Sequence, residues 1–148
     1  MATNSFQITV DCADPDTLAH FWATALGYDL HEPPEPHESW GAYWMSLGMS
    51  EEEAYDGYDA IVDPEGIRPR VWFQFVPETK SIKNRLHFDL LVGGGRDVPI
   101  EERIERVDAE AERLVSIGAT LLRVMDSRPF PHYAIAMADP EGNEFDIV

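Results

Sequence analysis

Two segments place ionisable side chains two residues apart, close enough to act together in a site. His87 precedes Asp89 in the strand expected at 86–92, and Glu144 precedes Asp146 near the C-terminus. Residues i and i+2 of a strand project from the same face, so each pair shares a face. Asp89 therefore either orients the His87 imidazole or faces solvent. Glu144 and Asp146 are carboxylates suited to moving a proton to or from a substrate.

Aromatic and basic side chains supply candidates for holding that substrate. Arg85 belongs to a basic cluster with Lys80 and Lys83, which either receives an anionic group or pairs with the many carboxylates of the chain. Trp72 and Phe73 are neighbours in a strand, so only one of them can face a pocket. Core packing is the alternative for every aromatic residue, and we favour it for Trp22. The aromatic candidates for substrate contact are Trp40, Trp44, Trp72 and Tyr133.

The charge balance excludes some partners. The 148 residues contain 28 Asp and Glu against 11 Lys and Arg, which gives a formal net charge of −17. Such a chain repels the phosphates of nucleic acids and the surface of anionic membranes. We expect neither of these partners, and we expect a small molecule, neutral or cationic, instead.

Cys12 is the only cysteine, so no disulfide can form within the chain and nothing ties it to an oxidising compartment. The sequence does not begin with a basic and then apolar leader, and no segment approaches the roughly 20 apolar residues of a membrane span. We expect a cytoplasmic protein in which Cys12 is a buried packing residue rather than a nucleophile, because no histidine lies beside it in sequence.

Hydrophobic periodicity predicts the elements that must position these side chains. Helices are expected at 15–27, with Asp14 as its cap and Pro15 in its first turn, and at 100–117. The capping-box pattern at 50–53 predicts a further short helix. The proline-rich segment 32–36 is expected to be a loop, and segment 40–47 gives no clear indication. Strands are expected at 6–10, 28–31, 58–62, 71–76, 86–92, 120–124, 133–137 and 145–148.

The order of these elements reveals a half-chain repeat. The turn sequence Asp-Pro-Glu-Gly occurs at 63–66 and again at 139–142, each time just before the last strand of its half. Both long helices end at a glycine, Gly27 or Gly118, that a strand follows. We therefore predict an α+β fold of two βαβββ modules, approximately 1–78 and 84–148. Their sheets are expected to form one curved mixed sheet around a central trough, which is the natural ligand site.

Six pieces of sequence follow one another in a familiar order over nearly the whole chain. They are Asp11-Cys12-Ala13-Asp14-Pro15, Phe21-Trp22, Ala25-Leu26-Gly27-Tyr28, Phe73-Gln74-Phe75-Val76-Pro77-Glu78, Lys83-Asn84-Arg85-Leu86-His87-Phe88-Asp89 and Asp139-Pro140-Glu141-Gly142-Asn143-Glu144-Phe145. This pattern resembles the glyoxalase-like domains of the vicinal oxygen chelate superfamily, which includes glyoxalase I, extradiol dioxygenases and bleomycin-resistance proteins. The resemblance specifies the fold more closely than the activity, because the same scaffold hosts several chemistries and metal-free binders.

The resemblance implies a metal site. Superfamily enzymes place metal ligands on the first and last strands of each half, and those positions fall here at Gln7, Gln74, His87 and Asp146. Such a set suits one divalent ion, for example Mg²⁺, Mn²⁺, Ni²⁺ or Zn²⁺. The alternative is that no metal binds and that Gln7 and Gln74 form hydrogen bonds in a polar pocket. In either case we expect the four side chains to point into one cavity.

The resemblance also implies an activity, that of a metal-assisted lyase or isomerase. A metal would polarise vicinal oxygens of the substrate and stabilise an enediolate, while Asp146 or Glu144 moves the proton. Extradiol dioxygenation is not expected, because the 2-His-1-carboxylate iron triad is not visible. One alternative is a metal-independent protein that sequesters a drug-like or cationic ligand, as bleomycin-resistance proteins do. Another is a domain that serves only in assembly.

Open sheet edges recruit further strands, so we expect a homodimer.

Overall fold

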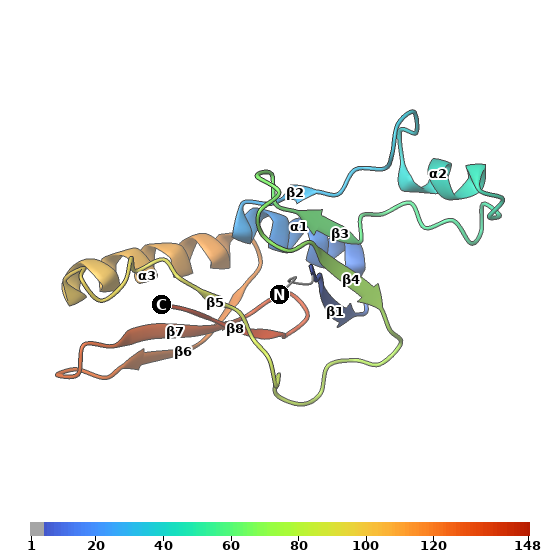
Figure 1. Cartoon of the computed structure of the whole chain (residues 1–148). Coiled ribbons are helices and arrows are strands. Elements are labelled where there is room, and N and C mark those ends of the chain that lie inside the picture. Colours follow the sequence, from blue (N-terminus) through green and yellow to red (C-terminus); the bar gives the residue numbers. More distant parts are fainter. Residues whose placement is uncertain (1–4) are drawn as a thin grey trace. The chain divides into compact units, whose positions relative to one another are not determined.

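The structure, a computed structural model, describes residues 5–148 and divides the chain between Thr79 and Lys80 into two compact units (Figure 1). The first unit contains β1 (Ile8–Cys12), α1 (Pro15–Leu26), β2 (Asp29–Leu30), α2 (Trp40–Ser46), β3 (Ala60–Val62) and β4 (Val71–Phe75). The second unit contains β5 (Asp89–Leu90), α3 (Ile100–Ser116), β6 (Thr120–Asp126), β7 (Tyr133–Ala138) and β8 (Glu144–Ile147).

Each unit holds a four-stranded mixed sheet, and the two sheets have the same topology. The strand orders are β1-β4-β3-β2 and β5-β8-β7-β6, with the first strand of each unit parallel to its last and the other pairs antiparallel. The predicted α+β class and the two βαβββ modules are thereby confirmed. The predicted trough spanning both modules stays a prediction.

Helix α1 forms where its capping signals predict. The Asp14 carboxylate accepts the Thr17 backbone N–H at 3.1 Å, and Pro15 occupies the first turn. At the other end Gly27 adopts φ +69°, a left-handed conformation that glycine reaches without strain. Trp22 is buried on the face that packs against β3 and β4, so its predicted role in the core is confirmed.

The first half of the chain departs from the prediction in one place and adds a helix where segment 40–47 gave no indication. The short helix predicted from residues 50–53 is wrong, because this segment forms a turn. The Ser50 hydroxyl still donates to Glu53 at 2.8 Å, but no apolar face follows to continue a helix, and one turn alone is unstable. A seven-residue helix, α2, forms instead at Trp40–Ser46, where the Ser39 hydroxyl caps the Ala42 N–H at 3.2 Å.

The same pattern of hydrogen bonds stabilises the repeated Asp-Pro-Glu-Gly turn in both units. Asp63 and Asp139 are buried, and each carboxylate accepts N–H groups from the residues that follow it. The bond from the Arg68 N–H is the main cause that lowers the pKa of Asp63 below its usual range. These turns set the start of β4 and β8, the strands that carry candidate site residues.

Two further predictions concern surfaces. Within residues 5–148 no helix is long and apolar enough to cross a membrane. Strand β6 forms one end of its sheet, and six of its seven residues are exposed. Such an edge is the kind of feature from which the homodimer was expected, and the homodimer stays a prediction.

Candidate functional site

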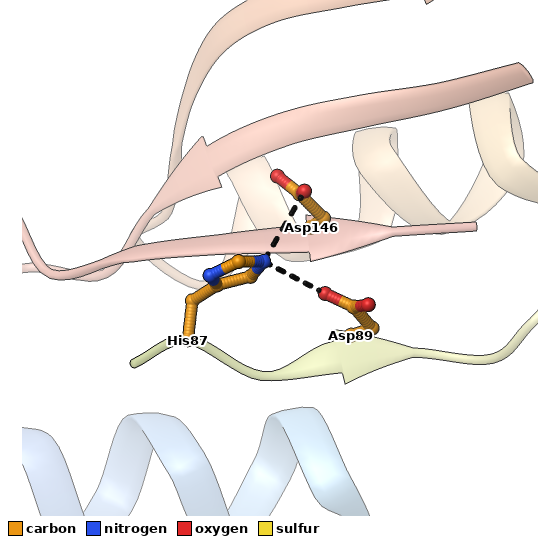
Figure 2. Close-up of side chains that lie close together, drawn as sticks. All are labelled: His87, Asp89 and Asp146. Carbon is orange, nitrogen blue, oxygen red and sulfur yellow. Dashed lines mark ion pairs between the residues drawn. The ribbon is translucent and has the colours of Figure 1, made fainter. Parts of the chain in front are cut away.

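Three ionisable side chains converge on one face of the second unit (Figure 2). The His87 Nε2 atom lies 3.1 Å from Asp89 Oδ1 and 3.6 Å from Asp146 Oδ2. Asp89 of β5 lies directly opposite Asp146 of β8 in the parallel pair, and His87 precedes Asp89 by two residues. The Asp146 N–H also donates to the Phe88 carbonyl at 2.9 Å, which fixes the peptide next to His87. Of the two alternatives for Asp89, contact with the imidazole is the one observed.

This cluster of His87, Asp89 and Asp146 fits a divalent metal ion. One ligand atom from each residue lies within 4.8 Å of the other two. Metal–ligand bonds of about 2.0–2.2 Å separate two ligand atoms of one ion by up to about 4.4 Å, so little movement is needed. A ligand set of one imidazole nitrogen and two carboxylates suits Mn²⁺ or Zn²⁺, and neither ion requires a cysteine ligand. The three side chains are partly exposed, which leaves room for a substrate or water as a further ligand.

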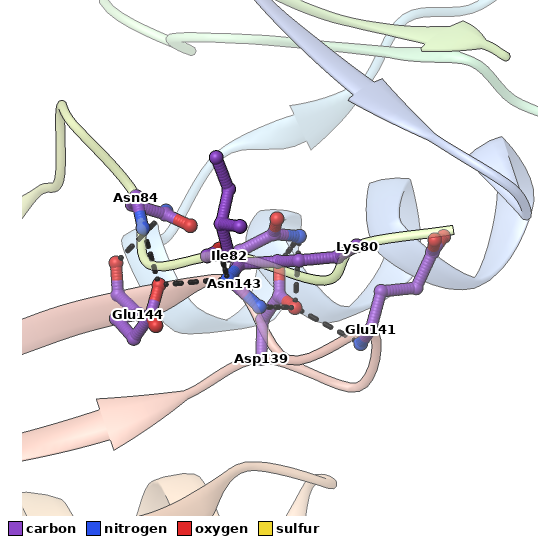
Figure 3. Close-up of polar contacts among 7 residues, drawn as sticks. All are labelled: Lys80, Ile82, Asn84, Asp139, Glu141, Asn143 and Glu144. Atoms are coloured by element: carbon purple, nitrogen blue, oxygen red, sulfur yellow. Dashed lines mark hydrogen bonds and ion pairs between the residues drawn. The ribbon is translucent and has the colours of Figure 1, made fainter. Parts of the chain in front are cut away.

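Glu144, the other predicted catalytic carboxylate, is engaged in anchoring a loop (Figure 3). Its Oε2 atom accepts the Asn84 backbone N–H at 2.9 Å and lies 3.0 Å from Lys80 Nζ, which also donates to the Ile82 carbonyl. The Asn84 bond first, and then Lys80, lower the pKa of Glu144 to about 2. Glu144 thus connects the segment before His87 to the start of β8. Lys80 pairs with a carboxylate, which is one of the two alternatives predicted for the basic cluster.

Acid unfolding tests this anchoring role. A carboxyl whose pKa is about 2 in the folded state stabilises the fold above pH 4.5 and loses that contribution as the pH falls towards 2. We expect Glu144→Gln to destabilise the protein by about 2 kcal/mol at pH 7 and by almost nothing near pH 2. Urea unfolding at both values measures the difference. Glu105→Gln, at an exposed position of α3, is the control, and equal effects of Glu144→Gln at both pH values would contradict the anchor.

The predicted ligands Gln7 and Gln74 belong to the first unit. Gln7 Oε1 accepts from Arg70 Nη1 at 2.8 Å, and Arg70 Nε donates to His31 Nδ1 at 3.3 Å. Desolvation, and then the charge of Arg70, lower the pKa of His31 below its usual range. The expectation that Gln7 and Gln74 share a cavity with the residues of the second unit stays a prediction.

The strand register adds a detail to the internal repeat. Thr9 lies opposite Trp72 in the first unit, as Asp89 lies opposite Asp146 in the second. If Thr9 of the first opening strand is equivalent to Asp89 of the second, Trp72 takes the place in β4 that Asp146 takes in β8. Gln74 then lies one step further along the same face of the strand.

A cavity of about 610 Å³ opens in the first unit around Trp72 and Gln74. Trp72 is half-buried, and its Nε1–H donates to Asp59 Oδ2 at 2.9 Å, while Phe73 is 1% exposed and belongs to the core. Both residues line the cavity, and Trp72 is the more exposed of the two. The sequence reasoning did not find Asp59, because nothing local marks its contact with a strand 13 residues away. The cavity is lined by Ala13, Asp14, Pro15, Tyr55, Asp59, Trp72, Phe73, Gln74 and Phe75.

The remaining predicted substrate contacts have structural partners of their own. Trp40 and Trp44 stack on α2 with ring centroids 5.6 Å apart, and Trp40 Nε1–H donates to the His31 carbonyl at 2.8 Å. Tyr133 donates from its hydroxyl to Asp108 at 2.6 Å. Burial, and then this bond, raise the pKa of Tyr133 to about 12. Their roles in substrate binding stay predictions, as does that of the exposed Arg85.

Comparison with known proteins adds the family. A family model described as "Glyoxalase-like domain" matches residues 7–148. None of the curated proteins matches the chain significantly.

Solved structures share the fold at low sequence identity. The hypothetical protein SA1046 from S. aureus is 15% identical, with a TM-score of 0.60 and coverage of 99% of this chain and 94% of that one. A glyoxalase/bleomycin resistance protein/dioxygenase family enzyme from Burkholderia phytofirmans PsJN is 18% identical, with a TM-score of 0.55 and coverage of 95% and 94%. A mutant of the fosfomycin resistance protein FosX from Listeria monocytogenes, complexed with Mn(II) and 1S,2S-dihydroxypropylphosphonic acid, is 13% identical, with a TM-score of 0.58 and coverage of 99% and 90%.

Proposed function

The chain belongs to the glyoxalase-like domain family, and from this membership we propose that it is a metal-assisted lyase or isomerase acting on a small substrate with vicinal oxygen atoms. The observation that carries the proposal is the convergence of His87, Asp89 and Asp146 on one face of the second unit. Support comes from a similarly folded FosX, which was solved with Mn(II). The proposed partner is thus a small molecule and not a nucleic acid or a membrane.

In this proposal two of the three residues hold the ion and the third moves a proton. His87 and Asp146 would hold the ion through Nε2 and a carboxylate oxygen. A divalent ion bound there supplies a Lewis acid beside the substrate oxygens. Asp89 is the more exposed of the two carboxylates, so it can exchange a proton with solvent while Asp146 stays in place. Glu144 remains a predicted catalytic residue, although its bonds to Asn84 and Lys80 favour the anchoring role.

Metal binding is the first test. Purified without chelator and titrated with MnCl₂, the protein is expected to bind one Mn²⁺ per chain, as measured by calorimetry and by the electron paramagnetic resonance signal of free Mn²⁺. Addition of EDTA is expected to remove the ion, because partly exposed ligands exchange with solvent. Gln7→Ala and Gln74→Ala in the same titration test the two predicted ligands of the first unit.

The alternative function makes the opposite prediction. A metal-independent protein that sequesters a drug-like ligand would bind neither Mn²⁺ nor Zn²⁺ stoichiometrically, and EDTA would leave its ligand binding unchanged. That result would overturn the metal-assisted proposal.

A further inference from the structure

The two units of the chain carry very different charge. Residues 5–79 contain fifteen Asp and Glu and only two basic residues, Arg68 and Arg70, whereas residues 80–148 contain thirteen acidic and nine basic residues. Both arginines of the first unit are engaged, because Arg68 lies 3.4 Å from Asp63 and Arg70 donates to Gln7 and His31. The negative potential of the first unit is therefore largely uncompensated by its own side chains.

The cavity of the first unit contains a fixed carboxylate. Asp59 Oδ2 accepts from Trp72 Nε1, and the Asp59 carbonyl accepts the Phe73 N–H at 2.7 Å. Both bonds restrain Asp59 beside β4. Among the described residues no donor is bonded to Asp59 Oδ1, and the side-chain amide of Gln74 also has no bonded partner there. The cavity thus presents an anionic acceptor and an amide to a ligand.

Aromatic rings form much of the remaining wall. Tyr55, Trp72 and Phe75 all line the cavity, and Phe75 is 64% exposed although it is a large apolar side chain. The faces of such rings attract cations, most strongly where solvent is partly excluded. Burial, and then the charges of Asp16 and other carboxylates, raise the pKa of Tyr55, which is consistent with negative potential at this wall.

We propose that this cavity binds a small organic cation with an apolar or aromatic body, its charged group bound by Asp59 and its body against Trp72 and Phe75. A volume of about 610 Å³ is ordinary for a small-molecule site. An anion is disfavoured because no lining residue is basic. A purely apolar ligand is disfavoured because it would desolvate the Asp59 carboxylate without replacing its water. The site needs no metal, so it goes beyond the function proposed above.

The test uses the full-length protein and benzyltrimethylammonium chloride as the probe. The indole N–H signals are followed by ¹H–¹⁵N NMR, with that of Trp72 assigned from the Trp72→Phe variant. We expect a saturable shift of the Trp72 signal, and at least fivefold weaker binding in Asp59→Asn, roughly the effect of losing one close ionic contact. Asparagine can still accept the Trp72 N–H, so persistence of that signal verifies that the variant is folded.

A matched control separates the site from general attraction of cations. Glu51→Gln removes the same charge from an exposed position outside the cavity, and it is expected to change the dissociation constant less than about twofold at 0.15 M salt. Equal weakening by Asp59→Asn and Glu51→Gln, or no saturable shift of the Trp72 signal, would overturn the proposal. Failure of the metal proposal would show separately, in the Mn²⁺ titration.

Discussion

Replacing His87 by alanine is expected to weaken Mn²⁺ binding at least about 100-fold. His87 supplies the nitrogen of the cluster, and its Nε2 atom lies within 3.6 Å of a carboxylate oxygen of both Asp89 and Asp146. Loss of a residue that only orients a metal ligand commonly costs 10–100-fold in affinity, so loss of a ligand should cost more. Calorimetric titration with MnCl₂ measures the change in the dissociation constant.

A second histidine of the same unit provides the control. His132 lies exposed in the turn between β6 and β7, outside the cluster, so His132→Ala should leave the Mn²⁺ affinity unchanged. Asp89→Asn distinguishes orientation of His87 from ligation of the metal. If Asp89 only orients His87, Asp89→Asn should weaken Mn²⁺ binding less than Asp146→Asn does. If His87→Ala binds Mn²⁺ as tightly as the wild type, the metal centre proposed for the second unit is refuted.

The second large effect is expected at the repeated turn, where Asp139→Ala should lower the free energy of unfolding by about 2–3 kcal/mol. The Asp139 side chain accepts the N–H groups of Glu141 and Asn143 at 2.9 Å and the Asn143 side-chain amide, and the residue is only 2% exposed. Alanine leaves these donors without their acceptor, and each unsatisfied buried donor costs about 1–3 kcal/mol, less where water can enter.

Urea unfolding followed by far-ultraviolet circular dichroism measures this loss. Asp97→Ala removes the same side chain from an exposed position of the same unit and should change stability by less than about 0.5 kcal/mol. Asp63→Ala should act in the same direction as Asp139→Ala, because its carboxylate holds the corresponding turn of the first unit. A loss at Asp139 no larger than the loss at Asp97 would show that the buried carboxylate does not hold the turn.

Features of the fold that depend on near neighbours could be predicted from the sequence. The Asp14 cap, the left-handed Gly27 and the apolar spacing of α1 and α3 act within one or two helical turns. The two Asp-Pro-Glu-Gly turns are equally local, and their recurrence in order revealed the two βαβββ modules. The wrong prediction of a helix at 50–53 shows the limit of such local signals. A capping box starts a helix only where an apolar face follows that can pack against the core.

The candidate site combines local and tertiary information. The two-residue period of the strand predicted at 86–92 places His87 and Asp89 on one face, and their contact is observed although β5 begins only at Asp89. That Asp146 joins them depends on the register of β5 against β8, strands that lie more than fifty residues apart in sequence. A register shifted by one residue would turn the Asp146 carboxylate to the other face of the sheet. The sequence alone does not fix this register, so it does not fix the contact.

Two further assignments were decided by tertiary contacts alone. Glu144 shares a strand with Asp146, yet its bonds to Asn84 and Lys80 make it an anchor with a lowered pKa. The Trp72 indole holds Asp59 at the wall of the cavity that Gln74 also lines. Sequence by itself determined the residue types, the local caps and turns and the repeat, because these follow from neighbouring residues. Only the tertiary structure decided which partner each carboxylate contacts, because that depends on strand register and on side chains brought together from distant segments.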